Sequence, residues 1–135
     1  MKRLLLLASL ILLLSGCQLP PERLPSPLPE DGKVSVTYAE LLTRARAQAR
    51  VANESFYVDK WTDLEDAARG LEQTAKFLPK ATEVPAKQKD TLPVVAGDLG
   101  KEAGALRDAA KAKDVEKTDD SLKRIHQTVR RLRIE

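Results

Sequence analysis

The pattern of apolar and polar residues divides the chain into a short apolar run, a proline-rich stretch and a long region of helical periodicity. In the last region, apolar residues recur at steps of three and four, which is the spacing of one face of an α-helix. No stretch alternates between apolar and polar residues as a half-buried strand does. The sequence therefore predicts an all-α fold, an antiparallel up-down four-helix bundle over residues 34–135.

The first predicted helix has clear signals at its start. Thr37 precedes Glu40 by three residues, as in a capping box, and Val36 and Leu41 are placed to form a hydrophobic staple. We therefore expect a helix that begins after Thr37. Its apolar face comprises Tyr38, Leu41, Leu42, Ala45, Ala49, Ala52 and Phe56.

The second predicted helix is bounded by Asp59, a candidate N-cap, and by Pro79, which cannot continue a helix. Its apolar residues form a narrow stripe of the kind that packs in antiparallel bundles. They are Trp61, Leu64, Ala68, Leu71, Ala75 and Leu78. A polar connection from residue 80 to residue 90 follows.

The third predicted helix begins near Pro93, because proline lacks an amide hydrogen that would have no partner in a first turn. Gly97, Gly100 and Gly104 lower its helix propensity, and they allow either close helix contact or a looser helix. Asp114 is the expected cap of the fourth helix. The two apolar seams are Leu92, Val95, Leu99, Leu106 and Ala110, then Val115, Thr118, Leu122, Ile125, Val129 and Leu132.

The chain begins with the pattern of an export signal. Lys2 and Arg3 precede an apolar run of 11 residues, Leu4 to Leu14. As a helix this run would be roughly 16 Å long, whereas a membrane span needs about 20 apolar residues. Residues 1–16 are therefore predicted to be a signal peptide and not a transmembrane helix.

Leu14-Ser15-Gly16-Cys17 resembles the lipobox of bacterial lipoproteins, in which small residues precede a cysteine. The resemblance implies cleavage before Cys17 and a diacylglyceryl group on its thiol. At about 0.8 kcal/mol per buried CH₂, two or three acyl chains such as palmitate make a stable anchor. The alternative is an ordinary secretory signal with an incidental cysteine.

The residue after the lipobox cysteine bears on which membrane holds the chain. In the sorting scheme of two-membrane bacteria that the lipobox implies, an aspartate at this position favours the inner membrane. Gln18 stands there. We therefore expect a lipid-anchored envelope protein on the periplasmic face of the outer membrane.

Residues 17–33 form a segment rich in proline, with five of the eight prolines of the chain. Proline favours extended conformations and lacks an amide donor. The segment is predicted to be a semi-rigid tether that reaches roughly 50 Å at ~3.1 Å per residue. A proline-rich docking motif is the alternative.

Charge and cysteine content exclude several classes of function. Without Lys2 and Arg3, 21 of the 23 basic residues remain against 20 acidic residues, which gives no reason to expect a nucleic-acid partner. Cys17 is the only cysteine, so the chain has no intramolecular disulfide and no thiolate metal cluster.

The predicted bundle also resembles the cytochrome c prime family, which carries haem near the end of its last helix. The similar stretch runs from Leu106 to Asp114 and leads into the final helix. The resemblance places Ile125 and Thr128 at the haem-linking cysteines and Val129 at the axial histidine. It places Leu132 and Arg133 at an aromatic-arginine pair. A generic exported bundle is the alternative and has the same fold.

Every residue that defines the haem chemistry is replaced. Covalent attachment of haem needs two thiols, and the only cysteine is Cys17 of the lipid anchor. Non-covalent haem in related bundles needs a methionine and a histidine, and the only methionine, Met1, leaves with the signal peptide. His126, the only histidine, is interpreted as a solvated or rim residue, because one imidazole does not make a metal site. We therefore predict no cofactor and no metal.

No catalytic constellation is visible in the sequence either. The clustered carboxylates are interpreted as solvated helix faces: Asp63, Glu65, Asp66, Asp119 and Asp120. The aromatic residues Phe56, Tyr57 and Trp61 are expected to pack at a helix corner, with a partner-binding patch as the alternative. The basic residues of the last helix are expected to serve capping and solubility, with contact to anionic lipid or cell-wall polymer as the alternative: Lys123, Arg124, Arg130, Arg131 and Arg133.

The leading hypothesis is a haem-free, non-enzymatic lipoprotein that acts as an interaction or structural module of the envelope. We expect lipid on Cys17 to hold it to the membrane, and we expect a protein partner in the envelope. A ligand or cofactor carrier of the haem type is the first alternative. An enzyme whose site is shared with a partner is the second.

Overall fold

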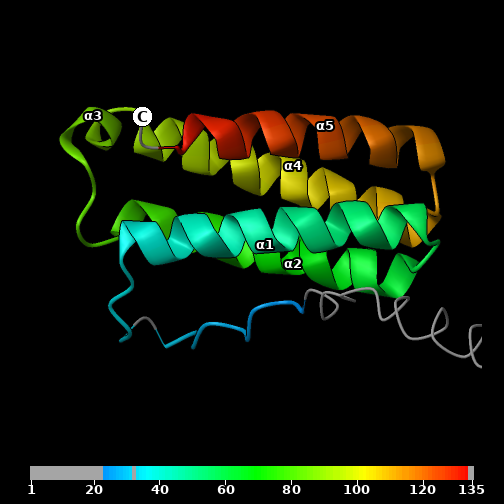
Figure 1. The fold of residues 1–135 in the computed structure, drawn as a ribbon, viewed down its shortest axis with the longest axis horizontal. Coiled ribbons are helices and arrows are strands. Elements are labelled where there is room, and N and C mark those ends of the chain that lie inside the picture. The colour runs from blue at the N-terminus through cyan, green and yellow to red at the C-terminus, as the bar shows by residue number, and fades with distance from the viewer. Residues whose placement is uncertain (1–22, 32, 134–135) are drawn as a thin grey trace, which may run out of the picture.

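The computed structural model describes residues 23–31 and 33–133, and this part of the chain is all-α as predicted. Four long helices lie side by side, and consecutive ones run in opposite directions (Figure 1). They are α1 (Tyr38–Tyr57), α2 (Trp61–Phe77), α4 (Leu92–Ala112) and α5 (Val115–Arg131). A 3₁₀ turn, η1 (Leu78–Lys80), follows α2, and a short helix, α3 (Ala86–Lys89), lies in the connection that the sequence predicted only as polar. No helix among the described residues is long and apolar enough to span a membrane.

Helix α1 begins where the capping signals predict. The Thr37 hydroxyl accepts a hydrogen bond from the Glu40 amide at 3.2 Å, which satisfies one of the free donors of the first turn. Val36 is 3% exposed and Leu41 is fully buried, so both residues of the expected staple lie in the core.

The turn between α1 and α2 corrects the prediction that Asp59 is the N-cap of the second helix. Asp59 has φ 56°, so it ends α1 in the left-handed conformation instead. The amide of Asp59 bonds the Phe56 carbonyl, and the amide of Lys60 bonds the Ser55 carbonyl, which is the Schellman pattern. Lys60 then precedes α2 without a side-chain cap. The error arose because Asp is favoured at both kinds of helix end.

The turn between α4 and α5 repeats this arrangement with one difference. Lys113 takes the left-handed conformation at φ 52°, and the Asp114 amide bonds the Ala109 carbonyl. Asp114 also caps α5, because its carboxylate accepts from the Lys117 amide at 3.0 Å. The prediction for Asp114 is therefore confirmed.

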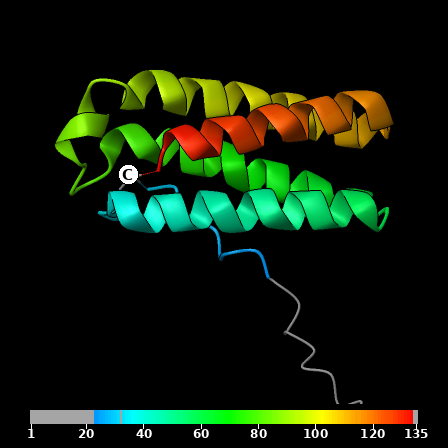
Figure 2. The same cartoon turned by 45° about the horizontal axis from the view of Figure 1, so that its top comes forward.

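One buried core runs through the four long helices. Its largest fully buried aliphatic side chains include Leu64, Leu71, Leu99, Leu106 and Ile125. At one end of the bundle the Tyr38 hydroxyl donates to the Leu132 carbonyl, which ties the start of α1 to the end of α5. Figure 2 shows the same four helices from a second side.

The glycines of α4 differ in what they face. A Cβ on Gly100 would lie 3.5 Å from the Ala75 side chain, and one on Gly104 would lie 3.3 Å from the Glu72 carboxylate. That carboxylate also accepts two hydrogen bonds from Arg107, at 3.0 and 2.8 Å. A Cβ on Gly97 would meet nothing within 4 Å. Gly100 and Gly104 therefore allow close contact with α2, whereas Gly97 has no such role.

We predict that Gly97→Ala stabilises the fold by about 0.5–1 kcal/mol, because alanine loses less backbone entropy in a helix. Gly104→Ala should gain less, because its methyl group would displace the Glu72 carboxylate that Arg107 holds. Chemical denaturation of the two variants measures the difference. An equal gain in both variants would contradict this account of α4.

Candidate functional site

The proline-rich segment before α1 packs on the bundle over residues 23–31, where the sequence predicted a semi-rigid tether without such contacts. Residues 23–31, which we call the strap, contain no helix or strand. Leu28 is only 5% exposed and belongs to the core, and Leu24 packs against the core. From the start of α1 the strap runs back along α1 and α2 (Figures 1 and 2).

Polar contacts hold the backbone of the strap in place. The Gln73 side-chain amide donates to the Leu28 carbonyl at 2.8 Å and accepts from the Leu28 amide at 2.9 Å. Arg44 donates to the Ser26 carbonyl at 2.7 Å. Gln73 thus binds the strap as a neighbouring β-strand would, through both backbone groups of one residue.

A second contact fixes the chain between the strap and α1. The Tyr38 amide donates to the Thr82 carbonyl at 2.9 Å, and the Thr82 amide donates to the Val36 carbonyl at 3.0 Å. These bonds pair the segment before α1 with the segment after η1. Gln73 and Arg44 therefore hold the strap itself, at Leu28 and Ser26, and this bridge holds the chain between the strap and α1.

A groove of about 820 Å³ lies between the strap and α2, compared with about 410 and 390 Å³ for two other cavities. Its lining mixes apolar residues with acidic and basic ones in equal number. The charged members are Glu30, Asp66, Glu72, Arg69, Lys76 and Lys80. The balance of charges favours a neutral occupant over a strongly charged one.

Gln48 on α1 lines the groove although it is 3% exposed. Its side-chain oxygen accepts from the Thr74 hydroxyl at 2.8 Å. A Cβ on Gly70 would stand 2.8 Å from its side-chain nitrogen, so the glycine makes room for the amide. Sequence reasoning missed this pair, although Gln48 and Thr74 interrupt apolar faces and so give a signal for it.

The positions that the haem resemblance singled out are part of the core. Ile125 is fully buried, Thr128 is 5% exposed and Val129 is 6% exposed. The Thr128 hydroxyl donates to the Arg124 carbonyl at 2.9 Å. Side chains of the chain itself therefore occupy the space at these positions.

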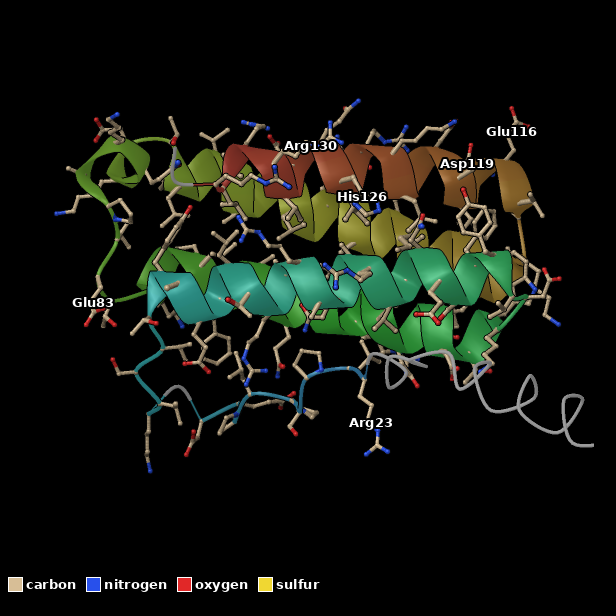
Figure 3. All side chains as sticks on the ribbon, in the orientation of Figure 1. Arg23, Glu83, Glu116, Asp119, His126 and Arg130 are labelled. Carbon is tan, nitrogen blue, oxygen red and sulfur yellow. The ribbon has the colours of Figure 1, made fainter. Side chains whose placement is uncertain are left out.

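His126 lies on α5 and is half-buried (Figure 3). Burial lowers the pKa of its imidazole, and the positive charge of Arg130 lowers it further. Among the described residues, no group of three or more His, Cys, Asp or Glu side chains is arranged to hold a metal ion.

Most of the charged residues that the sequence singled out make ion pairs. Lys123 pairs with Asp119 at 2.5 Å, Arg124 with Glu102 at 2.7 Å and Arg131 with Asp98 at 2.7 Å. Arg69 pairs with Glu65 and Asp66. The remaining two basic residues, Arg130 and Arg133, line the cavity of about 390 Å³ with Lys87.

The three aromatic residues at the α1–α2 turn are divided between core and surface. Phe56 and Trp61 are partly buried against the core and make an edge contact, with ring centroids 6.0 Å apart. Tyr57 is 76% exposed. The predicted helix corner thus accounts for two of the three rings.

Comparison with known proteins bears on the anchor, which lies outside the described residues. Residues 1–18 match the family model described as prokaryotic membrane lipoprotein lipid attachment site. This match supports a bacterial lipoprotein, held to the cell envelope by lipid. No curated protein and no solved structure matches the chain.

We predict that Leu28→Ala releases the strap and leaves the helices intact. Loss of the buried side chain should cost about 2 kcal/mol and raise the undocked population roughly thirty-fold. The rate of tryptic cleavage after Lys33 measures this population, and circular dichroism reports on the helices. Val34→Ala is the control, because Val34 is 43% exposed. Unchanged cleavage of Leu28→Ala would mean that Leu28 does not hold the strap.

We also predict that His126 makes the fold less stable at acidic pH. Because the folded state has the lowered pKa, it binds a proton less readily than the unfolded chain, whose histidine keeps the ordinary pKa of about 6.5. Its contribution to stability is full above that value and is lost as the pH falls through the folded pKa. As the pH is lowered from 7.5 to 5, the melting temperature of the parent protein should therefore fall more steeply than that of His126→Gln. Parallel curves would contradict the prediction.

Proposed function

We propose that this lipid-anchored protein is a non-enzymatic interaction module, whose groove beside the strap holds an extended segment of an envelope protein. The observation that carries the proposal is the way Gln73 binds the backbone of Leu28. A side-chain amide that bonds one backbone N–H and one backbone carbonyl can recognise an extended chain of many different sequences, because it contacts no side chain of that chain. Surfaces that bind proline-rich segments use the same low-entropy extended conformation.

The composition of the groove supports a peptide occupant. Its apolar lining comes from prolines and leucine of the strap and from Phe77, and its charged residues balance. A segment lying beside the strap would contact both the strap and α2. The occupied core positions Ile125 and Val129 favour this proposal over a haem carrier.

We further propose that the four long helices form an up-down four-helix bundle and that the protein lies on the periplasmic face of the outer membrane.

Descent from bundles of the cytochrome c prime type is a further proposal, supported only by the pattern of the last helix. A Soret absorbance of the purified protein that survives dialysis would instead favour the carrier function.

The groove is tested by cross-linking in cells. We expect a photo-reactive residue in place of Lys76, which lines the groove, to give a defined adduct with an envelope protein. Mass spectrometry should find the cross-link in an extended segment of that protein. The same residue in place of Lys101, exposed on α4, is the control. Equal adducts at both positions, or none at Lys76, would contradict the proposal.

The anchor and its location are tested separately. Cys17→Ser should release the protein from membranes with the helices intact, because no acyl chain is then attached. Gln18→Asp should move the lipidated protein from the outer-membrane fraction to the inner-membrane fraction of a density gradient. Retention of Cys17→Ser in membranes after a high-salt wash would disprove the lipid anchor.

A further inference from the structure

Exposed apolar side chains gather at one end of the bundle. Among the described residues, five large hydrophobic side chains are exposed, and three of them lie in or directly beside the turns that join α1 to α2 and α4 to α5. We call these three the apolar tip: Tyr57, Val58 and Val115, which are 76%, 55% and 60% exposed. Both turns lie at the same end of the bundle (Figure 1).

The fold does not require an apolar residue at position 58. The α1–α2 turn depends on the left-handed Asp59 and on backbone hydrogen bonds, which a polar residue at position 58 would leave intact. Phe56 and Trp61 already fill the nearby edge of the core. The exposed aromatic and aliphatic side chains therefore point to a partner with an apolar interior.

The surroundings of the apolar tip resemble those of a membrane-interface anchor. Lys60 and Lys117 flank the turns together with Asp59 and Glu116, and all four side chains are exposed. A tyrosine beside lysines suits the boundary between lipid headgroups and acyl chains, where the ring is partly buried and the ammonium groups remain in water. Because the acidic residues offset the lysines, apolar contact is the main attraction.

The strap runs toward the same end of the bundle as it approaches Arg23 (Figures 1 and 3). The strap passes Gln73 at Leu28 and continues from there toward the end of the bundle with the α1–α2 turn (Figure 1). Figure 3 shows Arg23 on this course beneath the α1–α2 pair. Cys17 precedes Arg23 by six residues, which span at most ~20 Å.

The course of the strap favours one end of the bundle for contact with the membrane. From Gln73, which binds Leu28, to Trp61 the helix rises about 18 Å, and the 11 positions from Leu28 back to Cys17 span at most ~36 Å, so the chain reaches the apolar tip with length to spare. The strap runs away from the end of the bundle that carries η1 and α3 (Figure 1). The docked strap thus favours the apolar tip over the α3 end.

We propose that the apolar tip rests in the interfacial region of the membrane that holds the lipid anchor, so that the bundle stands end-on with α3 away from the bilayer. The acyl chains supply the affinity, and the three side chains set the orientation. The proposal does not depend on the partner groove, and its failure would leave that function untouched.

Trp61, the only tryptophan, opens α2 at the same end and serves as the reporter. The lipidated protein is reconstituted in vesicles whose phospholipids carry bromine on the upper acyl chains, which quenches nearby indoles. We expect Trp61 emission to be quenched relative to unbrominated vesicles. The triple variant Tyr57→Ser, Val58→Ser, Val115→Ser should remain bound to vesicles and lose at least half of this quenching.

The control moves the reporter to the other end. In a Trp61→Phe, Lys87→Trp variant the indole lies on exposed α3, and its emission should be quenched little. Circular dichroism checks that each variant keeps its helices. Three outcomes would overturn the proposal: no quenching of Trp61, equal quenching of the α3 reporter, or unchanged quenching in the triple variant.

Discussion

The close packing of α2 against α4 is the constraint on which the rest of the structure depends. Gly100 and Gly104 leave α4 without side chains where Ala75 and Glu72 of α2 approach. Arg107 then fixes the rotation of the pair through its paired bonds to Glu72. With α2 held in this way, its opposite side is presented to α1 and to the strap, where Gln73 and Thr74 make their hydrogen bonds.

The strap joins the anchor to the fold. A free proline-rich spacer would let the bundle sample many distances and orientations above the membrane. Docking replaces that freedom with a fixed course along α1 and α2, because Leu28 is buried and its backbone is bonded to Gln73. The groove and the apolar tip therefore each have a fixed position relative to Arg23, where the described chain begins.

Helix positions could be predicted from the sequence because they depend on local chemistry. Thr37 and Asp114 bond amides within three residues, and apolar seams need only the helical repeat. The strap could not be predicted, since its contacts join residues 45 positions apart. Asp59 was assigned wrongly because its side chain suits the start of one helix and its backbone suits the end of another. The lipid-attachment signal was predictable because it is contained in residues 1–18, which match the family model.

The docked strap also determines how the molecule responds to mechanical load. A pull on the membrane anchor acts first at Arg23 and would peel the strap from the groove one contact at a time, so that the bonds at Ser26 and Leu28 break in sequence and not together. Each release lengthens the connection from Cys17, from the six positions to Arg23 up to about 20 positions when α1 is reached, roughly 60 Å of extended chain. Under tension the strap thus detaches and lengthens the connection before the four long helices unfold.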